Sequence, residues 1–273
     1  MTTAPGFVPL HTSAPRSRPE WELEDEEKMP VSPSHNDAVL LLSSVLSAWV
    51  ARAGLDASIE HDIALRWDPE HPRVGVDPDI AVFEPALPDR DRILSAKTWL
   101  EGHAPPPLAI EIVSTTNPKK DYGQSPEKYA ANGTEELWIF DPRLAGPRTG
   151  GGPFLLQVWR RASDGGFERV YAGPGPARSA RLDAWIVVTD EGRRVRVADD
   201  PDARALWPTL EEKARAETAR ERAAKEKERA AKEMERAAKE AAIAEKDAAI
   251  AEKGAALAEL AALKAELARR SGR

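Results

Sequence analysis

Two acidic residues stand in apolar segments where a charged side chain is unexpected. Asp79 opens the apolar run 80–83, and Glu111 lies inside the run 108–113. If both runs are buried strands, each carboxylate needs a cation or hydrogen-bond donors, because an unpaired buried charge is strongly unfavourable. Two carboxylates with a backbone carbonyl form the hard oxygen site that Mg²⁺ or Mn²⁺ prefers. We therefore expect Asp79, Glu111 and the carbonyl of Ile112 to bind such a cation, which could activate water and stabilise charge on a phosphodiester.

The elements that must position these carboxylates are short strands and two helices. A helical segment at about 124–132 separates the apolar runs 108–113 and 137–140, and this order implies a parallel pair of strands. A second helix is predicted over about 35–52, with Ser34 as its N-cap. The expected fold class is therefore α/β or mixed α+β. The segments predicted to form strands are 58–67, 80–83, 108–113, 137–140, 154–159, 167–171 and 185–188.

Composition divides the chain into three parts. Residues 1–20 are rich in Pro, Ser and Thr and are expected to form a disordered leader. Residues 21–200 carry the predicted strands and are expected to form one folded domain. Residues 208–270 are rich in Ala, Glu, Lys and Arg, which are strong helix formers, and they predict one long charged helix.

The third part repeats every seven residues from Arg222 onward, and this period is typical of a left-handed coiled coil. Placing Ile243, Ile250 and Leu257 at the a positions puts lysines at two of the d positions, so the apolar seam is weak. A homo-oligomer formed through this helix is the favoured interpretation. A solitary solvated helix is the alternative.

Composition also excludes several kinds of site. The chain has no cysteine, so disulfides, thiolate metal sites and a cysteine nucleophile are ruled out. No stretch reaches the roughly 18 apolar residues needed to cross a bilayer, and the first residues lack a signal-peptide core. We therefore expect a soluble, cytoplasmic protein without a membrane partner. Residues 1–210 hold 23 basic and 32 acidic residues, which argues against simple DNA coating but allows a local basic groove.

An ordered set of motifs between Trp21 and Pro142 resembles the PD-(D/E)xK nuclease superfamily and, within it, the Uma-type restriction endonucleases common in bacteria. The resemblance implies a restriction-endonuclease-like core, with a central mixed sheet flanked by helices. It also implies that Asp79 and Glu111 are metal ligands and that DNA is the substrate. The motifs are Pro78-Asp79-Ile80, Glu111-Ile112-Val113-Ser114, and a helix that leads through Tyr129 and Gly133 to Glu136-Leu137-Trp138-Ile139-Phe140-Asp141-Pro142.

The chain departs from this resemblance at the lysine of the site. The superfamily lysine, two residues after the glutamate, is Val113 here, and the Uma-type position in the following helix is Ser125. Lys128 lies three residues after Ser125, close to one helical turn, so it is the candidate catalytic replacement. Lys119 and Lys120 rank lower. The alternative for Lys128 is a surface lysine without a catalytic role.

Several other polar residues are weaker candidates for the site. Asp121 is interpreted as an N-cap, and His35 as a residue that makes local hydrogen bonds rather than one that takes part in catalysis. Four acidic residues could approach the metal but rank below Asp79 and Glu111. They are Glu22, Glu24, Glu60 and Asp62.

Two hypotheses from different classes follow. The first is a Mg²⁺- or Mn²⁺-dependent DNA endonuclease that uses Asp79, Glu111 and Lys128 and pairs its subunits through the C-terminal helix. The second is a catalytically inactive scaffold that keeps the nuclease fold and acts through its C-terminal coiled coil. The position of the Lys128 ammonium relative to the two carboxylates would discriminate them, as would an assay for DNA cleavage.

Overall fold

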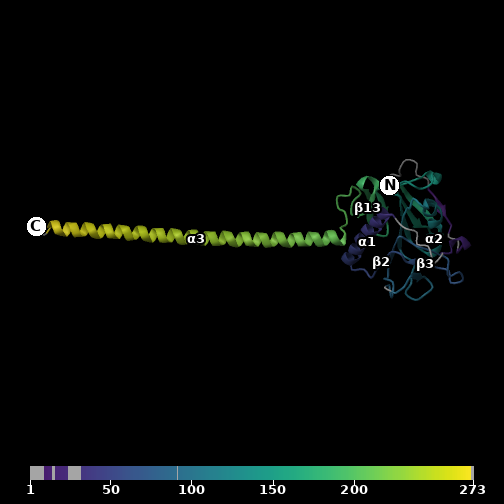
Figure 1. Cartoon of the computed structure of the whole chain (residues 1–273), viewed down its shortest axis with the longest axis horizontal. Coiled ribbons are helices and arrows are strands. Elements are labelled where there is room, and N and C mark those ends of the chain that lie inside the picture. Colours follow the sequence, from purple (N-terminus) through teal and green to yellow (C-terminus); the bar gives the residue numbers. More distant parts are fainter. Residues whose placement is uncertain (1–8, 14–15, 24–31, 91, 272–273) are drawn as a thin grey trace. The chain divides into compact units, whose positions relative to one another are not determined.

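The computed structural model describes residues 9–13, 16–23, 32–90 and 92–271. Its contacts divide the chain into two compact units, Met1–Glu212 and Lys213–Arg273 (Figure 1). The first unit is mixed α+β and is built around one large sheet. The second unit is helical.

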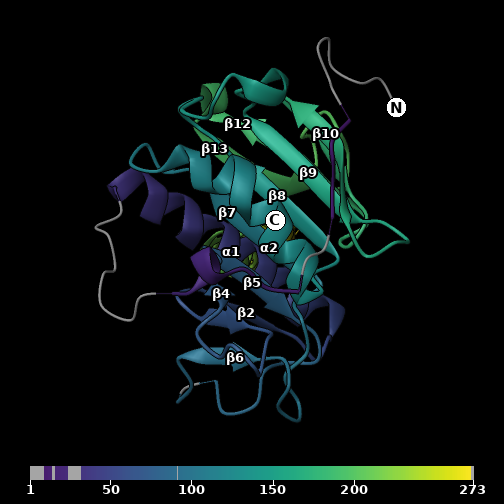
Figure 2. The same cartoon turned by 90° about the vertical axis from the view of Figure 1, so that its right-hand side faces the viewer.

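The large sheet has seven strands in the order β1-β10-β9-β8-β7-β5-β2 (Figure 2). β7 and β8 are parallel, as the strand–helix–strand order predicted, and every other neighbouring pair in this sheet is antiparallel. The predicted fold class is confirmed. The strands are β1 (His11–Thr12), β2 (Ser58–Glu60), β5 (Ile80–Phe83), β7 (Leu108–Ile112), β8 (Glu136–Phe140), β9 (Leu156–Arg161) and β10 (Phe167–Gly173).

The two faces of this sheet bury different side chains, because successive strand residues point to opposite faces. On one face, Ile110 and Ile112 pack in a core with α1 (Pro33–Ala53) and a three-stranded sheet, β11-β12-β13. On the other face, Ala109 packs in a second core with α2 (Ser125–Asn132). The alternation therefore points Glu111 toward α2. The smaller sheet's strands are β11 (Ala177–Ser179), β12 (Ala184–Thr189) and β13 (Arg194–Ala198).

Helix α1 begins at Pro33, two residues earlier than the predicted N-cap Ser34 allows. Ser32, not Ser34, is the N-cap, and its Oγ accepts a hydrogen bond from the backbone N–H of His35 at 3.3 Å. Pro33 takes the first helical position, where its fixed φ suits the helix and its missing N–H costs nothing. Ser34 consequently lies in the first turn.

Helix α2 is preceded by a π-turn, η2 (Lys120–Gln124), which the sequence pattern did not predict. The interpretation of Asp121 as an N-cap is wrong, because Asp121 lies inside this turn and is buried. α2 ends at Gly133, whose left-handed φ of 101° closes the helix.

Part of the chain differs from the predicted segments. The predicted strand 58–67 is two strands in different sheets, β2 and β3 (Ala64–Arg66), interrupted at Asp62 with its positive φ of 60°. β3 pairs with β4 (Gly75–Val76) and β6 (Ser95–Lys97) in a third sheet. The disordered leader expected over 1–20 is wrong for His11–Thr12, which pair with β10 as β1.

The long C-terminal helix predicted from composition is present as α3 (Leu210–Ser271). It begins with a reciprocal cap, in which Thr209 Oγ1 accepts from the Glu212 N–H at 3.0 Å and Glu212 Oε2 accepts from the Thr209 N–H at 2.8 Å. Among the described residues, no helix has both the length and the apolar character required to cross a membrane.

Candidate active site

Asp79 lies at the start of β5, beside Glu111 in the adjacent strand β7. The strands are antiparallel, with Ile80 opposite Ile110, so Asp79 comes next to the position of Glu111. Asp79 Oδ2 accepts a hydrogen bond of 2.6 Å from the backbone N–H of Ile112. This contact fixes one carboxylate oxygen against the neighbouring strand. The two predicted acidic residues are therefore brought together by strand pairing.

Glu111 is almost completely buried, at 2% exposure. Its Oε1 accepts a hydrogen bond of 2.7 Å from the hydroxyl of Tyr129 in α2. Burial raises the pKa of Glu111 well above its ordinary value, the ammonium of Lys120 opposes this rise, and the negative charges of Asp79 and Asp121 add to it. A carboxylate in these surroundings is stabilised in its charged form by a cation.

His35 reaches the site from the first turn of α1. Its Nε2 lies 3.0 Å from Asp79 Oδ1, and this hydrogen bond is the main cause of the raised pKa of His35. The expectation that His35 makes only local hydrogen bonds is wrong for its side chain, which joins two elements 44 residues apart. Its other ring nitrogen, Nδ1, is buried and has no hydrogen-bond partner among the described residues.

Two lysines that interact electrostatically with Glu111 have pKa values shifted in opposite directions. Lys128 is buried, and desolvation, with the repulsion of Lys120 second, lowers its pKa to about 8. Lys120 is only partly buried, and the attraction of Glu111, ahead of Asp121 and Asp79, raises its pKa. Lys119 is exposed. Lys120 begins the π-turn η2, which helical spacing did not predict, so its place in the chain differs from the one expected.

Asp121 is a third buried acidic residue near Asp79 and Glu111. Burial raises its pKa to about 7, Asp79 adds to this rise, and Lys120 and His35 oppose it. Within the described ranges, no three His, Cys, Asp or Glu side chains are arranged to hold a metal ion. Asp79 and Glu111 repel each other electrostatically, and carboxylate oxygens are the kind of ligand that a divalent cation prefers.

The weaker acidic candidates are occupied elsewhere or exposed. Glu22 forms an ion pair with Arg73, and Glu60 with Arg90 at 3.0 Å. Asp62 is exposed in the turn between β2 and β3, and Glu24 lies outside the described residues. These acids therefore do not extend the Asp79–Glu111 pair in the part of the chain that the structure describes.

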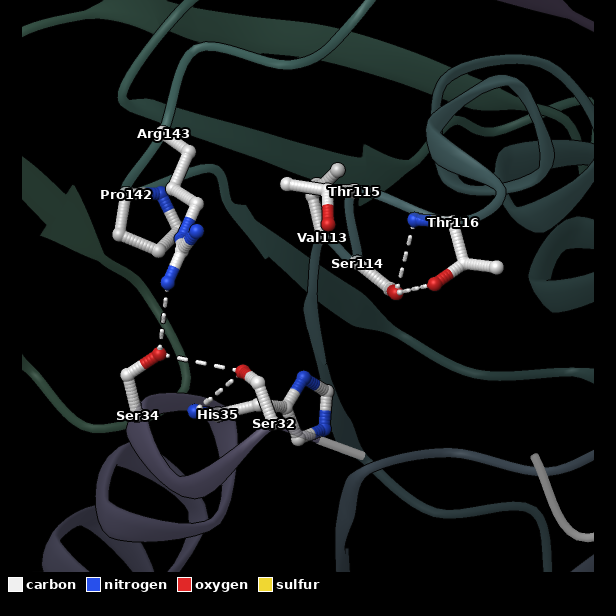
Figure 3. A pocket seen from close by; sticks show the side chains of 9 residues that line it. All are labelled: Ser32, Ser34, His35, Val113, Ser114, Thr115, Thr116, Pro142 and Arg143. Carbon is white, nitrogen blue, oxygen red and sulfur yellow. Dashed lines mark hydrogen bonds between the residues drawn. The ribbon is translucent and has the colours of Figure 1, made fainter. Parts of the chain in front are cut away.

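A polar cavity of about 170 Å³ lies at the start of α1, next to the site (Figure 3). His35 is one of its walls and also holds Asp79. The hydroxyl of Ser34 accepts a hydrogen bond of 3.4 Å from Arg143 across the cavity, and Ser114 and Thr116 line the opposite wall (Figure 3). No carboxylate lines this cavity among the described residues, and Arg143 contributes a guanidinium to the lining.

Comparisons with known proteins bear on the segment that contains the site. A model of the Uma2 family, described as "Putative restriction endonuclease", matches residues 11–146. Among solved structures, the chain is similar to a protein described as a "putative nuclease belonging to DUF820" from Anabaena variabilis. That similarity has 16% sequence identity and a TM-score of 0.38, and it covers 56% of this chain and 76% of that one. No curated protein matches the chain.

Proposed function

We propose that the chain, whose residues 11–146 match the Uma2 family model, is a metal-dependent DNA endonuclease. The observation that supports the proposal best is the pair of carboxylates, Asp79 and Glu111, on neighbouring strands beside two lysines. Asp79 and Glu111 would hold Mg²⁺ or Mn²⁺, with the carbonyl of Ile112 as a third ligand. Such an ion supplies a Lewis acid that stabilises charge on the phosphodiester and lowers the pKa of water.

The residues around the carboxylates would keep this site in one geometry. His35 orients Asp79 from one oxygen while the Ile112 N–H holds the other, and Tyr129 orients Glu111. Groups that orient metal ligands in this way usually tune metal affinity and activity.

Lys128 is proposed to act on the attacking water. Its pKa of about 8 leaves a fraction of its amine unprotonated near neutral pH, and an unprotonated amine can accept a proton from water. This assignment keeps Lys128 as a catalytic residue although its position differs from the usual lysine positions, here Val113 and Ser125.

The cavity beside His35 is proposed to hold a backbone phosphate next to the one that is cleaved. A helix start, hydroxyl groups and one arginine suit a phosphate oxygen, and no carboxylate opposes it within the described lining. Such a subsite would give the acidic chain the local anion-binding surface that DNA binding requires.

Helix α3 is proposed to pair subunits, so that two sites can act on the two DNA strands. Apolar side chains recur along the helix at spacings of seven residues, and each is about half exposed or more. They include Ile243 at 60%, Ile250 at 60% and Leu257 at 58%. Burying such a series against a second copy is the usual reason for a heptad pattern.

The direct test is cleavage of supercoiled plasmid in the presence of Mg²⁺ or Mn²⁺. We expect Asp79→Asn and Glu111→Gln each to lower the cleavage rate by about 100-fold or more, since both changes remove a negative metal ligand. Asp62→Asn makes the same carboxylate-to-amide substitution at an exposed residue. It is the matched control and should cleave at the wild-type rate. Cleavage that persists in both site variants refutes the site.

The second candidate function is an inactive scaffold, favoured by Val113 and Ser125 at the two usual lysine positions and by the net acidic character of residues 1–210. It predicts that the wild-type chain binds the cation and oligomerises through α3 but cleaves no DNA with either metal. The same plasmid assay therefore distinguishes the two functions.

A further inference from the structure

We propose that Lys120 is the permanent cation of the site, and that its ammonium binds the nonbridging oxygens of the phosphate being cleaved. This assignment rests on the proposed endonuclease function and adds a residue to it. Lys120 lies in the π-turn η2, outside the regular helix that carries Lys128.

The π-turn determines which way Lys120 faces. The backbone N–H of Ser125 donates to the carbonyl of Lys120, which is the i to i+5 bond of a π-helix. In a continuous α-helix, Lys120 would be rotated by about 140° from Ser125. The wider turn reduces this rotation, and its hydrogen bond places the Lys120 carbonyl against the N–H of Ser125.

The face that contains Ser125 is the face of α2 that meets Glu111. Ser125, Lys128 and Tyr129 lie three and four residues apart, so they share one side of the helix, and all three are buried. Tyr129 donates its hydroxyl hydrogen to Glu111 at 2.7 Å. Lys120 is joined to this part of the helix by its bond to the Ser125 N–H, and its ammonium is attracted by Glu111 and Asp79.

The surrounding charges favour a protonated Lys120. Four carboxylates attract its ammonium, and they raise its pKa although burial acts in the opposite direction. Glu111 raises the pKa of Lys120 most, and burial, which lowers it, is the second-largest effect. Asp121, Asp79 and Asp77 raise it by smaller amounts. Lys128 is in the opposite state, with a lowered pKa. The two lysines can therefore have different roles, with Lys120 as a fixed positive charge and Lys128 as a proton acceptor.

The solvent exposure of the two side chains supports the same assignment of roles. Lys120 keeps part of its side chain at the surface, where a phosphate can reach it, whereas Lys128 is 5% exposed. Neither ammonium has a hydrogen-bond or ion-pair partner among the described residues. The Oγ of Ser125, whose backbone N–H bonds to Lys120, is buried and also lacks a partner there. A cation placed at Ser125 would reach the same space.

The reaction itself needs no further reagent. A water oxygen forms a new bond to phosphorus, and the bond from phosphorus to the leaving sugar oxygen breaks. One proton of that water passes to the amine of Lys128, and the leaving oxygen takes up a proton from solvent. Lys120 keeps all of its protons and only balances the negative charge that builds on the phosphate oxygens.

The test uses the full chain and the plasmid assay with Mg²⁺. Lys120→Met keeps the apolar stem of the side chain and removes its charge. We expect it to lower kcat by about 100-fold or more while KM changes by less than about threefold, because the interaction is made mainly in the transition state. Lys119→Met, at the exposed neighbouring lysine, is the matched control and should stay within about twofold of the wild type.

Relocation of the charge provides the decisive comparison. In the double variant Lys120→Met with Ser125→Lys, we expect at least a tenfold recovery of kcat, and Lys120→Arg should also retain activity. A Lys120→Met variant that folds, as judged by its thermal midpoint, and cleaves within about threefold of the wild type overturns the assignment of Lys120 alone. Loss in Lys120→Met without recovery in either cationic variant also overturns it. A wild-type chain that does not cleave overturns the proposed function, and the role of Lys120 with it.

Discussion

Each carboxylate of the site is held by a donor from a different element. Asp79 accepts from His35 of α1 and from the backbone of β7, and Glu111 accepts from Tyr129 of α2. These donors are fewer than the oxygens of two carboxylates can accept, and burial makes the deficit costly. Hydrogen bonds from these donors therefore satisfy only part of the acceptor capacity of the two carboxylates.

Asp121 predicts how the metal-free protein responds to pH. Its pKa is raised to about 7 in the folded state, so its contribution to stability is fully present below the unfolded value and is lost as pH rises through about 7. Asp121→Asn removes this ionisation. From pH 5 to pH 8 in EDTA, the unfolding free energy of the wild type should fall relative to Asp121→Asn by on the order of 2 kcal/mol.

Urea denaturation of both proteins at the two pH values measures this difference. Asp62→Asn, at an exposed position, should follow the wild type and serves as the control. Parallel pH profiles for the wild type and Asp121→Asn would show that the buried carboxyl is not ionising in this range.

At the scale of elements, the sequence predicted the strands that consist of continuous apolar residues. It also predicted which of these strands pair in parallel. The run 108–113 and the run 137–140 are β7 and β8, and the helix between them made the pair parallel. A short continuous apolar run indicates such strands because all of their residues are buried. Asp79 and Glu111 came together for the same reason, since their strands are direct neighbours.

The elements that could not be predicted depend on distant contacts or on one unusual hydrogen bond. β1 and β4 have two residues each, too few for any period, and they form because β10 and β3 lie beside them. The π-turn adds one residue to a helical turn, and residue types do not reveal that change. For this reason the sequence did not predict where Lys120 lies relative to α2.

The end of α2 offers a test of how strictly that helix is positioned. Gly133 has a φ of 101°, and a Cβ at this position would lie 2.7 Å from Cγ of Pro105. Gly133→Ala should therefore lower the unfolding free energy of the first unit by about 1–3 kcal/mol and reduce cleavage, because α2 carries Lys128 and Tyr129.

Gly254→Ala is the matched control in α3, where nothing lies within 4 Å of the added Cβ. It should leave the unfolding of the first unit unchanged and stabilise the long helix by up to about 1 kcal/mol. Circular dichroism during urea denaturation would follow both. If Gly133→Ala leaves the unfolding free energy of the first unit unchanged, the expected strain at this position is contradicted.

The cavity at the start of α1 predicts a specific effect on DNA binding. Arg143→Ala, made in the cleavage-deficient Asp79→Asn chain, should weaken binding of a labelled duplex several-fold and make its salt dependence shallower by about one unit. Arg148→Ala changes an exposed arginine of the same loop that does not line the cavity, and is the control. Fluorescence anisotropy at several salt concentrations measures both. Equal losses in the two variants would remove the cavity from the DNA-binding surface.

At the scale of the whole molecule, the charge of the chain differs between its parts. Residues 1–210 hold 23 basic and 32 acidic residues, and residues 211–273 hold 16 basic and 14 acidic residues. The net negative charge of the first part would repel DNA, so the proposed function requires local cationic groups, and Arg143 and Lys120 are the proposed ones. Pairing of two chains would double the number of such groups on one DNA molecule.

Oligomerisation through α3 has its own prediction. Sedimentation equilibrium of the full chain should show a concentration-dependent oligomer, and Ile250→Lys should shift it toward monomer because a charge then replaces a central apolar contact. Ala248→Lys, also on α3 but two residues away from that seam, is the control and should associate as the wild type does. A wild-type chain that remains monomeric at high concentration would contradict the coiled coil.

Binding of Mn²⁺ tests the central claim most directly, because it examines Asp79 and Glu111 without requiring catalysis. Electron paramagnetic resonance titration of the wild-type chain should give one bound Mn²⁺ per chain, with affinity that rises with pH because binding displaces the proton of Glu111. Asp79→Asn and Glu111→Gln should each weaken binding by at least about tenfold, and Asp62→Asn should not. Unchanged Mn²⁺ affinity in both site variants would contradict the assignment of these two carboxylates as metal ligands.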